Sequence, residues 1–96
     1  QEPLLKITML EDIIENYPDE TFLVMEGHDN AIIGVDMNTM RLVYSVTTIL
    51  ENLMAQGMDD EEAIEFYDYN IACAYFGEKT PVLCDDTFDS KDHLNN

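Results

Sequence analysis

The side chains with the most regular chemical pattern in this sequence are carboxylates. Residues 59–76 read DDEEAIEFYDYNIACAYF, a stretch with six carboxylates and no cation. Residues three or four positions apart are neighbours on a helix, so Glu61, Glu65 and Asp68 are expected to form a ladder of negative charge on one helical face. Such a ladder can present to a basic protein much of what a phosphate backbone presents, and can occupy a groove lined by Lys and Arg.

Aromatic residues accompany these carboxylates. Tyr69 and Phe76 fall on the acidic side of the expected helix, where an interface explains them and burial does not. We therefore predict one partner-binding face, made of Glu61, Glu62, Glu65, Asp68, Tyr69 and Phe76. The alternative is that these are solvated charges, which keep a small protein soluble or reflect the acidic bias of a salt-adapted organism.

No arrangement typical of nucleophilic catalysis is found. A nucleophile needs a base beside it that a third group orients, and the only histidines, His28 in an expected turn and His93 near the end, lie in no recognisable signature. We interpret both as surface histidines. Cys73 falls on the buried side of its helix, where an apolar setting makes a thiol inert, so we predict that the protein is not an enzyme.

An acidic cluster near the end of the chain has side chains of the kind that bind hard metal cations. It consists of Asp85, Asp86, Asp89, Asp92 and His93. An EF-hand loop needs a glycine at its sixth position and a glutamate at its twelfth, and neither is present. Glycine-rich phosphate loops are also absent from the sequence. We expect weak, non-specific binding of divalent cations, and we predict no specific metal site and no cofactor.

The overall charge restricts the kinds of partner. Twenty-one acidic residues against four cations give 96 residues a net charge of −17, so direct binding to nucleic acid or to an anionic membrane is not expected. The 46% hydrophobic content favours a folded domain. With two cysteines and no signal peptide or transmembrane run, we expect reduced, mostly buried thiols in a cytoplasmic protein.

Hydrophobic periodicity predicts three helices. The first runs from about Thr8 to the residue before Pro18, and a start at Pro3 is the alternative. Its apolar face includes Leu4 and Ile7. The second spans residues 47–56 and ends at a glycine, and the third is the acidic stretch at 59–76, ended by Gly77. Thr8 with Glu11 and Asp59 with Glu62 have capping-box spacing. The core face of the third helix is predicted to hold Ile64, Tyr67, Ile71, Ala74 and Tyr75, widened by Ala63, Phe66, Asn70 and Cys73.

Four short apolar runs predict strands, at residues 21–25, 31–35, 41–44 and 80–84. The first two are expected to form a hairpin, because residues 26–30 have loop composition. The predicted fold is α+β in the order α-β-β-β-α-α-β: a small antiparallel sheet, a three-stranded meander plus one short strand, packed with about three helices. Residues 1–84 form one domain, and 85–96 a polar acidic tail with Phe88 as its anchor.

Parts of the chain resemble a group of small proteins encoded by tailed bacteriophages. The pattern comprises AIIGV, RLVYS, GM before EEAIE, and N-x-x-x-A-Y-x-G-E-x-T-P, matched by residues 31–35, 41–45, 57–58, 61–65 and 70–81. The resemblance carries no catalytic assignment. Small acidic phage proteins include DNA mimics and inhibitors of restriction, CRISPR effectors or host transcription, so it favours an inhibitor by analogy.

We therefore predict a phage-encoded acidic inhibitor that binds a basic, nucleic-acid-handling host protein, such as a nuclease, a CRISPR effector or a transcription component. The first alternative is a self-associating structural or accessory phage protein without catalytic activity, for example a homodimer whose strand edges pair. The second is a small protein that binds or sequesters a ligand.

Overall fold

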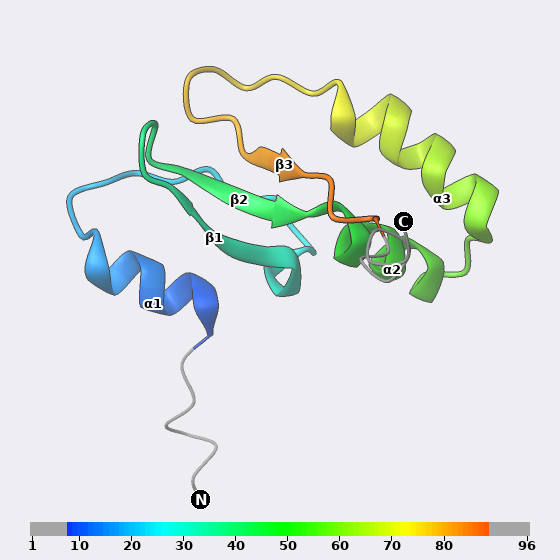
Figure 1. The fold of residues 1–96 in the computed structure, drawn as a ribbon, viewed down its shortest axis with the longest axis horizontal. Coiled ribbons are helices and arrows are strands. Elements are labelled where there is room, and N and C mark those ends of the chain that lie inside the picture. Colours follow the sequence, from blue (N-terminus) through cyan, green and yellow to red (C-terminus); the bar gives the residue numbers. More distant parts are fainter. Residues whose placement is uncertain (1–7, 89–96) are drawn as a thin grey trace, which may run out of the picture.

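The computed structural model describes residues 8–88 (Figure 1). Its elements are α1 (Met9–Asn16), the 3-10 turn η2 (Asp29–Ala31), β1 (Ile32–Asp36), β2 (Arg41–Ser45), α2 (Val46–Ala55), α3 (Asp60–Tyr67), the π-helical η3 (Asp68–Ala72) and β3 (Val82–Cys84). The fold is α+β, as the sequence predicts. In the part of the chain described, no helix has the length and apolar character needed to cross a membrane.

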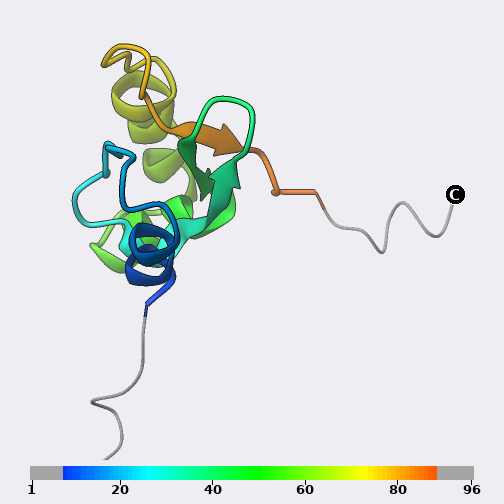
Figure 2. The same cartoon turned by 90° about the vertical axis from the view of Figure 1, so that its left-hand side faces the viewer.

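The sheet has three strands in the order β1-β2-β3. β1 and β2 form an antiparallel hairpin, whereas β2 and β3 run parallel. The prediction of an antiparallel sheet is therefore wrong for the last strand. Parallel neighbours need a long crossover between them, and α2, α3 and η3 supply it. α1 lies on the β1 side of the sheet and α3 on the β3 side (Figures 1 and 2).

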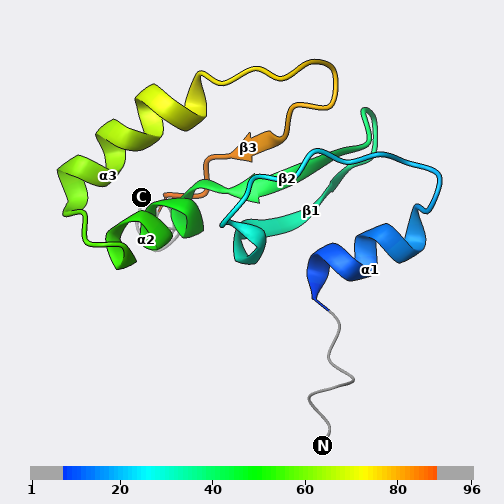
Figure 3. The same ribbon diagram turned by 180° about the vertical axis from the view of Figure 1, so that it is seen from behind.

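Residues 21–25 are extended but form no strand, so the predicted hairpin with residues 31–35 is also wrong. The segment crosses the face of the sheet that is turned toward the viewer in Figure 3. A side chain of β2 holds the segment to the sheet, because the Met25 N–H donates to the Tyr44 hydroxyl at 2.7 Å. A backbone N–H satisfied in this way does not need a strand ladder, and the segment covers the sheet without joining it.

The core forms between the sheet, α1, α2 and the segment at residues 21–25. Leu42 and Tyr44 on β2 and Ile49 on α2 are the largest fully buried side chains. Arg41 and Val43, which alternate with Leu42 and Tyr44, are partly exposed, which confirms the alternation predicted for residues 41–44. Ala63 is the one buried residue of α3, so α3 contributes little to the core.

Helix ends follow the local sequence signals. Both predicted capping boxes are present: Glu11 N–H donates to Thr8 Oγ1 at 3.1 Å, and Glu62 N–H donates to Asp59 Oδ1 at 2.8 Å, with each glutamate accepting in return. At the end of α2, Gly57 has φ +113°, the left-handed conformation that favours glycine. These predictions are confirmed.

The predicted single helix over residues 59–76 is wrong in its second half. After Tyr67 the backbone becomes the π-helix η3 and then leaves helical geometry, so Gly77 lies in a loop and does not end the helix. A π-turn bonds i to i+5 instead of i+4, which changes the face that each later residue presents. Tyr75, predicted to be core, lies beyond the end of the helical segment and is 76% exposed.

The first residues of the predicted tail are attached to the domain. Ser45 Oγ donates to Asp86 Oδ2 at 2.6 Å, and the Thr47 N–H donates to Asp86 Oδ1 at 2.9 Å. These bonds lower the pKa of Asp86 below its usual value, the Ser45 bond most. Asp86 thus places a negative charge at the positive end of α2.

Some sequence-based predictions fall outside the described residues. They are the earlier start of the first helix at Pro3, its apolar residues Leu4 and Ile7, and the tail side chains Asp89, Asp92 and His93.

Candidate functional site: an acidic helix face beside an apolar groove

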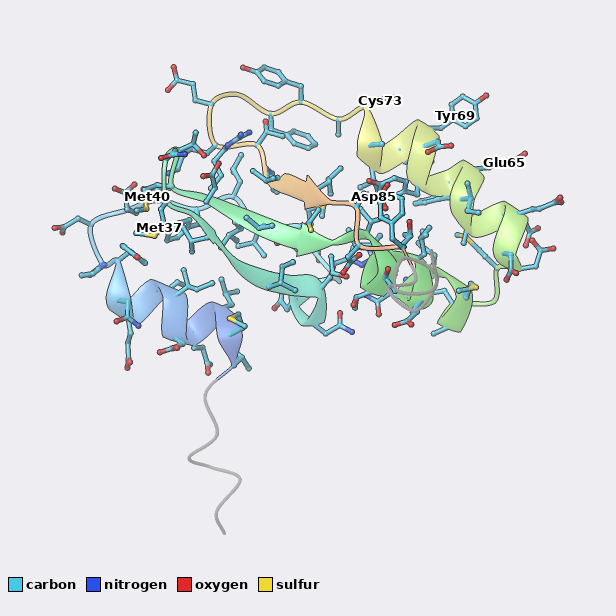
Figure 4. The ribbon with its side chains drawn as sticks, viewed as in Figure 1. Met37, Met40, Glu65, Tyr69, Cys73 and Asp85 are labelled. Atoms are coloured by element: carbon cyan, nitrogen blue, oxygen red, sulfur yellow. The ribbon has the colours of Figure 1, made fainter. Side chains whose placement is uncertain are left out.

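The predicted charge ladder lies on α3 and the first residue of η3. Glu61, Glu65 and Asp68 are all exposed. Their spacing of four and three residues places them along one side, and Glu65 points away from the sheet (Figure 4). These three side chains form what we call the acidic face.

The acidic face has no cationic partner within residues 8–88. In this range the only salt bridge joins Lys79 to Glu20 at 3.3 Å. Arg41 donates instead to Thr39 Oγ1 and to the Thr80 carbonyl, each at 3.0 Å. The charge of the acidic face is therefore directed outward and is not used to hold this part of the fold together.

Glu62 and Tyr69 lie beside the acidic face in different roles. Glu62 Oε1 accepts from the Asp59 N–H at 3.0 Å, so this carboxylate is partly engaged in capping α3. Tyr69 is 82% exposed and extends into solvent next to Glu65 (Figure 4). Glu62, Glu65 and Tyr69 share a shallow hollow with Phe66.

Phe76 does not lie on a helix face, because the helical segment has already ended at Ala72. It is exposed on the loop before β3, where its N–H donates to Thr80 Oγ1 at 2.7 Å. Phe76 lines a different feature, a large groove next to the acidic face. The structure thus brings five of the six predicted residues together and separates the sixth.

The groove, which we call the apolar groove, has a volume of about 890 Å³. Its walls come from residues 23–26, from the α3–η3 helical segment, and from β3 with the loop before it. Leu23, Val24 and Phe66 are exposed at its surface. It adjoins the acidic face, because Phe66 lines both the groove and the hollow that contains Glu65.

His28 is buried, with 8% of its surface exposed, so its interpretation as a surface histidine is wrong. It lines the apolar groove. Asn52 Nδ2 lies 3.0 Å from His28 Nδ1, and the Asn52 amide also exchanges two hydrogen bonds with Asn30, at 2.8 and 3.0 Å. In this arrangement Asn52 donates to Nδ1, and the proton of the neutral imidazole lies on Nε2.

Burial also lowers the pKa of His28 below its usual value. The unfolded chain, with a histidine pKa of about 6.5, therefore takes up this proton before the folded protein does. Folding stability contributed by neutral His28 is complete above about pH 6.5 and is lost as the pH falls toward the folded pKa.

We expect the free energy of unfolding to fall with pH below about 6.5, by up to about 1.4 kcal/mol per pH unit from this single group. His28→Gln should show a flatter profile over the same range, measured by urea denaturation at about pH 7.5, 6.5 and 5.5. The carboxylates titrate in both proteins, so the difference between the two profiles isolates His28. Parallel profiles would contradict the burial of a neutral imidazole.

Both cysteines are free thiols. Cys73, predicted to be buried, is exposed, and its Sγ donates to the Asp68 carbonyl at 3.2 Å. The prediction fails for the same reason as for Tyr75, since Cys73 immediately follows the π-helix. Cys84 is partly buried. Among residues 8–88, no group of three or more His, Cys, Asp or Glu side chains could hold a metal ion.

No protein-family model, curated protein or solved structure matches this chain. The groove was not predicted from sequence, although Phe76, one of its lining residues, was predicted to bind a partner. The sequence does single out Arg41, because it is the only cation between Lys6 and Lys79. No signal marked His28 or the wall at residues 23–26, because their positions depend on the non-strand path of that segment.

Proposed function

We propose that this protein is a phage-encoded acidic inhibitor that binds a basic, nucleic-acid-handling host protein through the acidic face. The observation that carries the proposal is the outward charge of Glu61, Glu65 and Asp68, which no cation in residues 8–88 pairs. The exposed Tyr69 beside them supports it, since aromatic residues are enriched in interfaces.

The spacing of the acidic face supports DNA mimicry over a short length. Seven residues separate Glu61 from Asp68 on a helix that rises about 1.5 Å per residue, which gives a ladder about 10 Å long. One strand of B-DNA carries a phosphate about every 3.4 Å along its axis. The ladder therefore spans about three phosphates, enough for one Lys and Arg cluster of a nucleic-acid-binding groove.

The net charge supports rapid association with a cationic target. A chain of charge −17 steers a basic partner toward itself, and such steering weakens as salt screens it. Binding through the acidic face should therefore weaken with rising ionic strength.

The proposal is tested by recovering partners from lysate of the bacterial host, with and without nuclease treatment. A basic protein should be retained after nuclease treatment, and this protein should displace DNA or RNA from it. If the captured protein holds its nucleic acid and this protein at once, mimicry is wrong.

Self-association through strand edges is the second candidate. β1 and β3 are the two outer strands of the sheet, and outer strands are common sites of pairing between chains. Sedimentation at low and high salt discriminates the candidates, because salt screens the repulsion between like chains and would tighten a homo-oligomer.

A further inference from the structure

The apolar groove has the size of a small-molecule site. Its volume of about 890 Å³ lies within the range of about 300–1,000 Å³ typical of ligand pockets. Arg41 begins β2, whereas His28 contacts Asn52 of α2, the helix that follows β2. Arg41 and the start of α2 lie at opposite ends of β2, so the two side chains line different ends of the groove.

Most of the groove wall is apolar. Val24 comes from the extended segment, Ile71 from η3, and Val82 and Leu83 from β3. Val24 and Phe66 are exposed there, so the apolar surface is accessible from solvent. A contiguous apolar surface with few polar groups favours a ligand with an apolar body.

Arg41 supplies positive charge at one end. Only two of its N–H groups are bonded, to Thr39 Oγ1 and to the Thr80 carbonyl, although a guanidinium has five donors. Within residues 8–88 no carboxylate lies within salt-bridge distance of Arg41, although Asp36, its neighbour across the β1–β2 hairpin, interacts with it electrostatically. An arginine in this state can bind a carboxylate through two parallel hydrogen bonds.

His28 supplies an uncharged donor at the other end. More than nine-tenths of its surface is buried, its Nδ1 is engaged by Asn52, and Nε2 has no hydrogen-bond partner among the described residues. Glu26, exposed on the rim close to His28, would repel an anion there. The two ends of the groove therefore differ: an anionic group suits the Arg41 end and a neutral oxygen suits the His28 end.

We propose that the apolar groove binds an elongated apolar molecule with a carboxylate at one end and an uncharged oxygen acceptor toward the other. Arg41 binds the carboxylate, and His28 donates from Nε2 to the oxygen. The proposal is independent of the acidic face. Ligand binding in the groove should strengthen with rising salt, whereas partner binding through the acidic face should weaken. The reason is that salt screens the repulsion between an anionic ligand and a chain of charge −17.

The test is an NMR titration of the ¹⁵N-labelled protein with three probes of equal chain length. ω-Hydroxydecanoate carries both groups, decanoate lacks the hydroxyl, and the corresponding amino alcohol replaces the carboxylate with an ammonium. We expect ω-hydroxydecanoate to shift the amides of residues 23–26 and of β3, and to bind about tenfold more tightly than the amino alcohol. Decanoate should lie between them, and affinity for both acids should rise with salt.

Arg41→Gln should weaken ω-hydroxydecanoate binding about tenfold. Lys79→Gln is the matched control: it removes the same charge, and its contacts, to Glu20, to the Met40 carbonyl and to the Phe22 ring, lie outside the groove. It should bind as the parent protein does. If Arg41→Gln fails to fold, Val24→Asp, at an exposed wall position, should cause a similar loss.

Three results would overturn the proposal. The amino alcohol could bind at least as tightly as the hydroxy acid, Arg41→Gln or a folded Val24→Asp could retain full affinity, or the probes could shift only amides outside the groove. None of these results bears on the partner capture, so failure here is distinguishable from failure of the proposed inhibitor function.

Discussion

A Glu65→Lys, Asp68→Lys double variant is expected to bind the captured basic partner at least about a hundredfold more weakly than the parent protein. Each reversal replaces an attraction with a repulsion, and tenfold per residue corresponds to about 1.4 kcal/mol. Both side chains are exposed, so the loss would arise at the interface and not from unfolding.

The fold of this variant should be preserved. Lys at position 65 lies four residues after Glu61, the spacing and order that stabilise a helix by about 0.2–0.5 kcal/mol. Each reversal adds two charge units, so the net charge moves from −17 to −13, which reduces self-repulsion. Circular dichroism should show an unchanged spectrum, and binding is measured by calorimetry at low salt.

The matched control is Glu15→Lys with Asp19→Lys. Both residues are exposed, at the end of α1 and just after it, on the opposite side of the sheet from α3 (Figure 2). The change in net charge is identical. The control should lose only the affinity that general attraction supplies, and an equal loss in both variants would place the effect in the overall charge and not in the acidic face.

Tyr44→Ala is expected to lower the free energy of unfolding by about 4 kcal/mol, as large aromatic-to-alanine substitutions in cores do. Tyr44 is fully buried, and its hydroxyl accepts the Met25 N–H. The substitution therefore creates a cavity and also leaves a backbone donor without its partner. Domains of this size have only about 5–15 kcal/mol of stability, so a large part of it would be lost.

Tyr44→Phe separates the two contributions. It keeps the ring and removes the hydroxyl, so it should cost about 1–2 kcal/mol. Tyr69→Ala, at a position 82% exposed, serves as the control and should change stability by less than about 0.5 kcal/mol. Urea denaturation followed by circular dichroism measures all three variants. A Tyr44→Phe variant as stable as the parent would mean that this hydroxyl does not hold residues 21–25 to the sheet.

Sequence patterns predicted the local features of this fold well. The capping boxes at Thr8 and Asp59, the left-handed Gly57 and the two strands of the hairpin all appear within one or two residues of their predicted positions. Each depends on contacts between residues close together in the chain. Such contacts are readable from side-chain type and spacing alone.

The failures have two physical causes, which are contacts with distant residues and a local change in helical geometry. Residues 21–25 have strand composition, but the Tyr44 hydroxyl takes the Met25 N–H that a strand partner would have used. A helical period of 100° per residue was extended through residues 68–72, where the π-helix changes it, and Tyr75 and Cys73 were misplaced as a result. His28 is polar and follows a glycine, yet the chain folds back and buries it beside Asn52.

For the candidate site, the sequence by itself determined the acidic face. Glu61, Glu65 and Asp68 are neighbours wherever this segment is helical, and the excess of acid over base leaves them few cations to pair with. Only the tertiary structure decided the apolar groove. Its walls come from segments far apart in the chain, and Arg41 and His28 meet it only because residues 21–28 cross one face of the sheet (Figure 3) and β3 returns parallel to β2.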